Sequence, residues 1–379
     1  MTDRSFAFVA GGGTAGHLQP ALAIAEALVE AGHHRDSIHF VGSARGQDAE
    51  ALAGRGFPSS LLPGRGIVRS FRPADVRQNV SALWGLGRAS ITAFTLVARL
   101  RPRVVVSVGG YASVPASLAA LVHRVPLVLV NIDAVPGAAN KLFGRFAAAS
   151  AVGWPGTPLP RAVVTGTPVR PAIADVDRSD QVARRAARRE LGMPEEGQVV
   201  VVFGGSLGAR RINQAVDSMG GVVVEGSQRS IYHIVGQRDW PRYEDAPAPL
   251  PEVIRVPYEQ RMDLVYLAAD VVVSRAGAMT VAELAASGVP AILVPLPGAP
   301  GDHQTANARV LADAGAARLL PDGSCTAATL GSLVEELLDA PDELALMGSR
   351  ALRLGRKDAA AAGARVVEAN ARGDREAHR

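Results

Sequence analysis

The order of apolar and polar residues divides the first part of the chain into short strands that alternate with helices. Runs of β-branched and aromatic residues predict strands at 6–10, 38–42, 103–110 and 126–130. Stretches rich in Ala and Leu predict helices at 18–32, 48–56 and 113–124. Strands that alternate with helices form parallel βαβ units, and strands that are apolar along their whole length indicate a sheet covered on both faces.

The same pattern restarts near residue 198. A strand, a glycine turn and a helix follow one another over 198–216, and further strands are expected at 231–236, 253–258, 270–277 and 290–297. The segment 164–180 is rich in Pro, Thr and Asp and is typical of a linker. We therefore predict an α/β protein with two Rossmann-like, doubly wound parallel-sheet domains that face each other across a cleft. The expected divisions are a first domain at 1–165, a linker at 166–180, a second domain at 181–350, and a C-terminal helix and polar tail at 351–379.

Composition narrows the class of protein. A chain of 379 residues is long enough for two domains, and 48% apolar with 20% charged residues is typical of globular proteins. The single cysteine, Cys325, excludes an intrachain disulfide and a cysteine metal cluster. The apolar stretch 81–100 contains Arg88 and Arg99, so we expect no transmembrane helix. The first residues lack the order of a signal peptide.

The net charge of +4 is unevenly distributed. Residues 63–103 contain eight arginines and one acidic residue, Asp75, with Phe71 and Trp84 among them. Such a stretch suits an anionic membrane surface or a nucleic acid. The alternative is an ordinary amphipathic helix with a solvated basic face, and the sequence leaves both interpretations open.

The first glycine loop, Gly11 to Gly16, fits the spacing G-x-G-x-x-G. A dinucleotide site also needs an acidic residue at the end of the second strand, and that strand ends at Gly42 and Ser43. We therefore reject a nicotinamide or flavin cofactor. His17 is expected in the first turn of the following helix, where the helix dipole disfavours the imidazolium form and suits a neutral general base. A capping or packing histidine is the structural alternative.

The second loop, Gly204 to Gly208, matches the G-x-S-x-G elbow of α/β-hydrolases around Ser206. Its expected partners, Asp302 and His303, are adjacent in sequence, so one cannot easily orient the other as a triad requires. We favour an anion cradle made of the Ser206 hydroxyl and the N–H groups of a helix start.

Two further segments combine polar residues with a helix start. Thr280 and Glu283 have the spacing of a capping box, although Glu283 could instead accept the hydroxyls of a ribose. The segment 301–308 contains the polar residues Asp302, His303, Gln304 and Asn307, which suit sugar hydroxyls or a capped loop. Asp175 and Asp177 form a D-x-D pair within the linker, which we interpret as solvated charge, and no group has convincing metal-ligand spacing.

Five segments occur in an order that is typical of one family. They are GGGTAGHLQP, SVGGYASVPASLAA, TPVRP, GGSLGARRIN and SRAGAMTVAELAASGVPAILVP. Over residues 6–350 the chain resembles the bacterial N-acetylglucosaminyltransferases of glycosyltransferase family 28, which form lipid II for peptidoglycan. The resemblance implies a GT-B fold and a metal-independent, inverting transfer that needs no cofactor. It also implies UDP-N-acetylglucosamine as donor and a polyprenyl-diphosphate-linked muramoyl peptide as acceptor, with no nucleic acid partner.

In the first domain the resemblance places the acceptor. Thr14, Ala15 and Gly16 are expected to line the cleft. His17 is expected to be the base that takes the proton of the acceptor hydroxyl. Residues 63–103 resemble the face that docks peripherally on the cytoplasmic side of the cell membrane.

In the second domain the resemblance places the donor. Arg170 and Ser206 are expected at the diphosphate, and the backbone at Glu259 is expected to read the uracil. Glu283 is expected on the ribose and Gln304 on the sugar hydroxyls. The remaining residues of the nucleotide-sugar loop are Ala278, Met279, Thr280, Val281 and Ala282.

Three positions depart from the family pattern where the sugar is expected. The segment 130–133 reads Val-Asn-Ile-Asp, so the family asparagine that touches the donor sugar becomes Asp133. Thr167 replaces an asparagine, and His303 precedes Gln304 where two glutamines are usual. These changes favour one alternative, a GT-B paralogue with another nucleotide sugar or acceptor. Two further alternatives stay open: a non-catalytic UDP-binding protein docked on a membrane, and a nucleotide-sugar epimerase.

Overall fold

The computed structural model describes residues 5–12, 15–44, 52–63, 73–205, 207–219, 228–246, 248, 250 and 252–373, with the backbone alone for residues 15 and 73–83. The chain forms two compact units. The first consists of Met1–Pro168 together with Asp358–Arg379, and the second of Val169–Lys357. The boundary between residues 168 and 169 falls inside the segment expected to be a linker.

The first unit is built on a parallel sheet whose strand order is β3-β2-β1-β4-β5-β6-β7. Its strands are β1 (Ala7–Gly12), β2 (Ile38–Ser43), β3 (Ser59–Leu62), β4 (Val104–Gly110), β5 (Leu127–Asn131), β6 (Ala149–Val152) and β7 (Ala162–Val164). The direction in which successive strands are added reverses between β1 and β4. These two strands are parallel neighbours, with Ala7 opposite Val104. Ligands of such sheets bind outside the carboxyl ends of the strands at this reversal.

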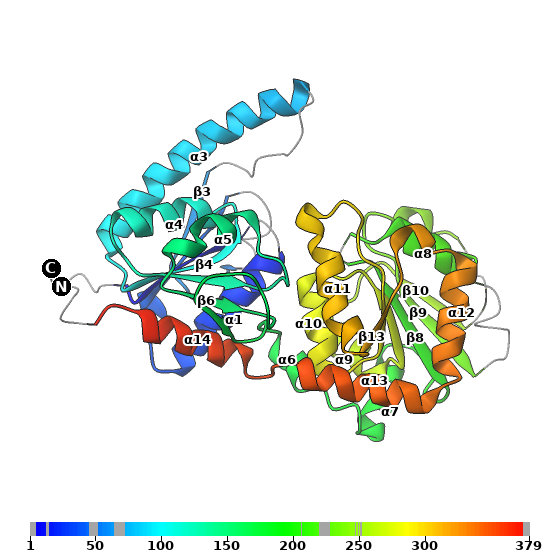
Figure 1. Ribbon diagram of the computed structural model, residues 1–379. Coiled ribbons are helices and arrows are strands. Elements are labelled where there is room, and N and C mark those ends of the chain that lie inside the picture. Colours follow the sequence, from blue (N-terminus) through cyan, green and yellow to red (C-terminus); the bar gives the residue numbers. More distant parts are fainter. Residues whose placement is uncertain are drawn as a thin grey trace. The chain divides into compact units, whose positions relative to one another are not determined.

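Helices cover both faces of this sheet (Figure 1). The helices of the first unit are α1 (Ala15–Glu30), α3 (Pro73–Leu100), α4 (Ser113–Val122), α5 (Ala138–Phe143) and α14 (Ala359–Asn370), with short 3-10 turns at Arg35–Ser37 and Gly144–Phe146. The helices α3, α4 and α5 pack on one face around Phe8, Val105 and Leu129. The helices α1 and α14 cover the opposite face. Every residue of β1 and β2 is buried, as a sheet covered on both sides requires.

The second unit repeats this architecture with the strand order β10-β9-β8-β11-β12-β13. Its strands are β8 (Gln198–Phe203), β9 (Arg229–Ile234), β10 (Val253–Val256), β11 (Val271–Ser274), β12 (Ala291–Leu293) and β13 (Ala317–Leu319). Its helices are α6 (Pro171–Ala174), α7 (Gln181–Glu190), α8 (Arg210–Asp217), α9 (Met262–Ala268), α10 (Ala278–Ser287), α11 (His303–Asp313), α12 (Ala327–Leu338) and α13 (Pro341–Leu354), with 3-10 turns at Trp240–Arg242, Pro300–Asp302 and Asp322–Ser324. All strand pairs are parallel, which confirms the predicted fold class.

The segment that enters the second unit is fixed by three arginines, of which Arg188 is buried. Arg178 donates hydrogen bonds to the carbonyl oxygens of Gly288 and Ala269. Arg184 and Arg188 bind the two carboxylate oxygens of Asp270, each at 2.8 Å. The start of the second unit is therefore attached to the ends of α9 and α10. Asp175 and Asp177 are exposed, as expected for solvated charges.

The C-terminal helix α14 returns to the first unit and packs against α1. His33 binds Glu368 at 3.0 Å, and the Nε of Arg103 donates to the carbonyl oxygen of Arg372 at 2.7 Å. Val367 on α14 is fully buried. The helix therefore completes the core of the first unit, although it follows the second unit in sequence.

We expect Val367→Ala to lower the free energy of unfolding of the first unit by about 2 kcal/mol, because it removes buried methyl groups and leaves a cavity. Val122→Ala is the matched control, since Val122 also lies on a helix of this unit and is 59% exposed. Its effect should stay within about 0.5 kcal/mol. Denaturant titration measures both. Equal effects of the two substitutions would contradict a structural role of α14.

Candidate functional site

The candidate residues form two groups, one at the carboxyl ends of each sheet. The first lies around β1 and β4 and includes His17 and Asp133. The second lies around β8 and β11 and includes Arg170 and Glu283.

In the first unit, two glycine turns meet at the sheet reversal. Gly11 and Gly12 end β1 and pair with Gly109 and Gly110 at the end of β4. A Cβ atom on Gly110 would lie 2.2 Å from the carbonyl oxygen of Gly12, and Gly110 has a φ of +81°. Only glycine allows this approach.

His17 lies in the first turn of α1, as predicted, and its ring stands against the second glycine turn. A Cβ atom on Gly109 would lie 3.0 Å from Nε2 of His17. The fully buried Ser113 fixes this turn, because its Oγ accepts a hydrogen bond from the N–H of Gly109 at 2.8 Å and lies 3.0 Å from the carbonyl oxygen of Ala10. The position of the imidazole therefore depends on the bare backbone beneath it.

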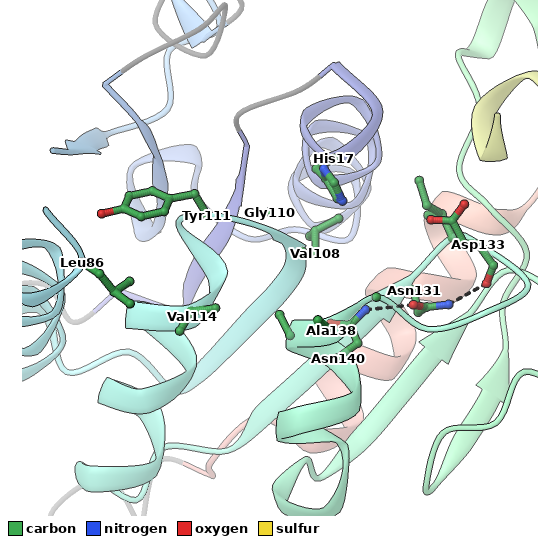
Figure 2. A pocket seen from close by; sticks show the side chains of 14 residues that line it. His17, Leu86, Val108, Gly110, Tyr111, Val114, Asn131, Asp133, Ala138 and Asn140 are labelled. Carbon is green, nitrogen blue, oxygen red and sulfur yellow. Dashed lines mark hydrogen bonds between the residues drawn. The ribbon is translucent and has the colours of Figure 1, made fainter. Parts of the chain in front are cut away.

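A pocket of about 540 Å³ opens beside His17 (Figure 2). Its wall is mostly apolar, with Val108, Tyr111 and Ile132 among its residues. Its polar residues besides His17 are Asn131, Asp133 and Asn140. An apolar pocket with a few convergent polar groups is typical of a binding site for an organic ligand.

A short chain of hydrogen bonds orders the polar side of this pocket. Nδ2 of Asn140 donates to Oδ1 of Asn131 at 3.0 Å, and Nδ2 of Asn131 donates to the carbonyl oxygen of Asp133 at 2.6 Å (Figure 2). The segment 130–133, which departs from the family pattern, is therefore held in place by the amide side chains of Asn131 and Asn140. Asp133 lies on the pocket wall, where a substrate hydroxyl could reach it.

Other predicted residues of the first unit are only partly described. Thr14 lies outside the described residues. Ala15 begins α1, and Gly16 is half-buried in its first turn.

In the second unit, Glu283 is buried on α10 and is not part of a capping box. The N-cap of α10 is Gly277, and Thr280 lies inside the helix. The Glu283 carboxylate instead accepts a hydrogen bond from the Tyr266 hydroxyl at 2.9 Å and lies 3.5 Å from a guanidinium nitrogen of Arg170. Burial raises the pKa of Glu283, while Arg170 and Tyr266 act in the opposite direction. The capping-box interpretation is therefore wrong.

The rest of the predicted nucleotide-sugar loop divides into two parts. Ala278, Met279 and Thr280 form the first turn of α10, where backbone N–H groups have no partner within the helix. Val281 and Ala282 are buried, and the N–H of Val281 donates to the carbonyl oxygen of Gly277. Anion contacts through the backbone are therefore available at the first turn. Ser206, in the preceding loop, lies outside the described residues.

The polar cluster after β12 holds its own loops together. Oε1 of Gln304 accepts a hydrogen bond from the N–H of Leu296 at 2.9 Å. The buried Asn307 donates to the carbonyl oxygen of Ala276 and so connects α11 to the loop before α10. Nδ1 of His303 lies 2.9 Å from the carbonyl oxygen of Pro300, which gives no support to an Asp–His pair of a hydrolase.

Glu259 is held from two sides. Its carboxylate accepts hydrogen bonds from the Tyr232 hydroxyl and from the N–H of Arg261, at 2.9 and 2.8 Å. Its side chain is thus engaged within the protein, which suits the expectation that the backbone of this segment contacts a ligand. Burial raises the pKa of Tyr232 well above its usual value, and the bond to Glu259 acts in the same direction.

The described part of α3 has one apolar face against the core and one exposed face. Trp84 is 76% and Ile91 is 70% exposed, and Arg88 lies between them on the same side. Arg103 does not contribute to a free basic face, because it binds the C-terminal segment. Arg65, Arg69 and Arg72 lie outside the described residues.

Within the described ranges, no group of three His, Cys, Asp or Glu residues has the arrangement of a metal site. Nor does any described helix combine the length and apolarity needed to cross a membrane.

Sequence reasoning did not single out three residues that the structure places at these sites. Tyr111 follows the glycines of the second turn and donates to the carbonyl oxygen of Pro63. Asn140 lies in the segment AVPGAANK, residues 134–141, which is similar to the family pattern and was therefore an available signal. Tyr266 lies on α9 without any motif around it, so the sequence gives no signal for it. Only the tertiary structure brings its hydroxyl to Glu283.

Comparisons with known proteins agree with this arrangement. The glycosyltransferase family 28 N-terminal domain matches residues 7–152, and the family 28 C-terminal domain matches residues 199–362. A relative from Acidothermus cellulolyticus is 40% identical over 361 residues, 93% of this chain and 94% of the relative. A relative from Nocardioides sp. is 39% identical over 365 residues, 95% and 96% of the two chains. Both are named UDP-N-acetylglucosamine--N-acetylmuramyl-(pentapeptide) pyrophosphoryl-undecaprenol N-acetylglucosamine transferase.

Solved structures show the same architecture. The crystal structure of Acinetobacter baumannii MurG has a TM-score of 0.73 at 28% identity and covers 96% of this chain and 99% of its own. The UDP-GlcNAc 2-epimerase from Neisseria meningitidis has a TM-score of 0.63 at 11% identity, with coverage of 96% and 98%. The second likeness concerns the fold alone.

We expect Gly109→Ala to displace the His17 ring, because the new methyl group would occupy the space of the imidazole. Gly156→Ala is the matched control: Gly156 has a φ of +78° and nothing within 4 Å of its Cβ position, so it shares the backbone strain alone. Resonances of labelled histidine, assigned with His17→Gln, measure the effect. The His17 signals should shift in Gly109→Ala only. Identical spectra for the two alanine variants would contradict the contact.

Proposed function

The chain belongs to glycosyltransferase family 28, and on that premise we propose that it transfers N-acetylglucosamine from UDP-N-acetylglucosamine to lipid I. The acceptor is the C4 hydroxyl of the muramoyl residue of a polyprenyl-diphosphate-linked pentapeptide, and the product is lipid II. This activity matches the names of relatives that are 36–40% identical along nearly the whole chain. It serves peptidoglycan synthesis in the cell wall.

The donor is assigned to the second unit. The observation that carries this assignment is the buried Glu283 carboxylate beside the first turn of α10, at the carboxyl end of β11. A carboxylate accepts the two hydroxyls of a ribose, while Arg170 and the free N–H groups of the first helical turn favour a diphosphate. Ser206 adds a hydroxyl to this anion site, the backbone at Glu259 contacts the uracil, and Gln304 contacts the sugar.

The acceptor is assigned to the first unit. The pocket beside His17 has room for a sugar and its substituents, and its amides offer partners for hydroxyl groups. Asp133 lies on the same wall and is proposed to contact the donor sugar. We assign Thr14, Ala15 and Gly16, which follow the same glycines in the sequence, to this acceptor site.

The chemistry is a single inverting displacement. Neutral His17 takes the proton of the acceptor hydroxyl while the oxygen attacks the anomeric carbon of the donor. The bond from that carbon to the diphosphate oxygen breaks, and UDP leaves with the electron pair. Arg170, Ser206 and the first-turn N–H groups of α10 stabilise the negative charge that develops on UDP.

If His17 is the base, its removal should lower turnover and leave the binding of the donor nucleotide unchanged. His17→Ala should lower kcat by about 10²–10⁴-fold, since it removes the base. The affinity for UDP should stay within about twofold, because the donor groups lie on the other unit. Steady-state transfer to a short-chain lipid I analogue and calorimetry with UDP measure the two quantities. His34→Ala removes an exposed imidazole of the same unit and is the control. Unchanged turnover of His17→Ala would remove His17 from this role.

We also propose that the exposed face of α3 docks the enzyme on the cytoplasmic side of the cell membrane. Its acceptor carries a polyprenyl chain, so the enzyme must work at a lipid surface. Trp84 and Ile91 offer apolar contact, and Arg88 offers attraction to anionic headgroups. Exposed apolar side chains occur elsewhere on the chain, but Trp84 and Ile91 flank the exposed Arg88 on one face of one helix, which is the combination that an anionic lipid surface favours.

Trp84→Ser combined with Ile91→Ser should therefore weaken binding to vesicles that contain phosphatidylglycerol by about tenfold or more, because apolar burial is lost. Co-sedimentation with vesicles at two salt concentrations measures the binding. The binding that remains in the double variant should depend more strongly on salt than that of the wild type, because it rests on charge alone. Val182→Ser changes an equally exposed residue on the second unit and should have no effect. Equal binding of all three proteins would contradict the docking face.

A further inference from the structure

One tyrosine hydroxyl is buried directly behind the donor site. Tyr266 lies on α9, its side chain is fully buried, and its hydroxyl donates to Oε2 of Glu283 at 2.9 Å. The ring packs edge-on against Phe203 at the end of β8, with 6.4 Å between the ring centroids. The packing that surrounds the ring therefore fixes where the hydroxyl points.

The direction of this hydrogen bond is set by the environment. Burial and the neighbouring carboxylate raise the pKa of Tyr266 well above its usual value, so the hydroxyl keeps its proton and is the donor. The carboxylate is the acceptor, and the bond favours its ionised form. A hydrogen bond to a buried charged group is among the stronger kinds in proteins.

The two partners of Glu283 differ in rigidity. The Arg170 side chain is 41% exposed, and its contact with Oε1 is long, at 3.5 Å. Tyr266 has a short contact from a closely packed ring. Arg170 can therefore turn toward a diphosphate, whereas Tyr266 keeps its place in the core.

The carboxylate also retains acceptor capacity after these contacts. Two carboxylate oxygens have about four lone-pair positions. One position on Oε2 is used by Tyr266, and one on Oε1 is used by Arg170. The remaining positions match two vicinal hydroxyl donors.

We infer that Tyr266 is a positioning residue of the donor site: its hydroxyl fixes the Glu283 carboxylate in the orientation that accepts the ribose hydroxyls of the nucleotide. This rests on the proposed function, in which Glu283 binds the ribose. Tyr266 acts through Glu283 and does not itself touch the substrate.

The test compares UDP with 2′-deoxy-UDP, which lacks one of the two ribose hydroxyls. Calorimetry on the full chain gives both dissociation constants for the wild type and for Tyr266→Phe, which loses only the hydroxyl. The wild type should prefer UDP. In Tyr266→Phe the affinity for UDP should fall about tenfold, the affinity for 2′-deoxy-UDP should fall less, and the preference for UDP should shrink.

Tyr243→Phe is the matched control. The Tyr243 hydroxyl also donates to a carboxylate, Asp217 at 2.7 Å, in the same unit but on other elements. Its loss should leave both dissociation constants unchanged. Glu283→Ala completes a thermodynamic cycle, in which Tyr266→Phe should add no further loss of UDP affinity.

The outcomes separate this inference from the function on which it rests. Equal weakening of both nucleotides by Tyr266→Phe, or no weakening at all, overturns the positioning role and leaves Glu283 on the ribose. If Glu283→Ala keeps the preference for UDP, the ribose assignment of Glu283 fails, and the inference fails with it. Should Tyr266→Phe not fold, 3-fluorotyrosine at position 266 replaces it. That residue makes the hydroxyl a stronger donor, so the nucleotide preference should change, and an unchanged preference overturns the inference.

Discussion

Each sheet places its reactive loops by bringing backbone against backbone at the carboxyl ends of neighbouring strands. In the first unit a Cβ atom at Gly110 would meet the carbonyl oxygen of Gly12 at 2.2 Å. In the second unit a Cβ atom at Gly236 would meet the N–H nitrogen of Gly208 at 2.2 Å. Side chains cannot enter these contacts, so the functional groups stand at their rims. This constraint puts His17 against one glycine turn and keeps the glycine contact after β8 in the other unit free of side chains.

The two units then provide different electrostatic environments for one reaction. The first combines a mostly apolar pocket with a single imidazole and a few amides, which suits a neutral base. The second places the buried Glu283 carboxylate and the Arg170 guanidinium beside a helix N-terminus. A nucleoside diphosphate sugar presents hydroxyl donors at the ribose and negative charge at the diphosphate. The carboxylate therefore suits the ribose, and the guanidinium suits the diphosphate. Preorganised donors of this kind stabilise a leaving diphosphate electrostatically.

Local patterns in the sequence were sufficient to predict much of this arrangement. Continuous apolar runs located the central strands, because a sheet covered on both faces needs them, and the glycine loops marked the ends of those strands. The strands β3, β6, β7 and β13 were not predicted, since none of them lies in a long continuous run of β-branched or aromatic residues. Of the helix expected at 48–56, residues 48–51 lie outside the described residues, and residues 53–55 form a turn and a bend instead of a helix.

The remaining differences arise from contacts between distant segments. Thr280 and Glu283 have the spacing of a cap, but α10 begins at Ala278, and its glutamate instead meets Tyr266 from another helix. Arg103 resembles part of a basic face, yet it binds the backbone of Arg372, far along the chain. Such pairings depend on which elements the fold places side by side. No local spacing contains that information.

The central claim is the identity of the sugar that is transferred, since Asp133, Thr167 and His303 depart from the family at positions expected near it. The most direct measurement offers UDP-N-acetylglucosamine, UDP-glucose and UDP-galactose in parallel, with a short-chain lipid I analogue as acceptor and EDTA present. The account predicts transfer from UDP-N-acetylglucosamine alone, at a rate that EDTA does not change. Preferred transfer from another donor, or binding of UDP without transfer from any of the three, would contradict it.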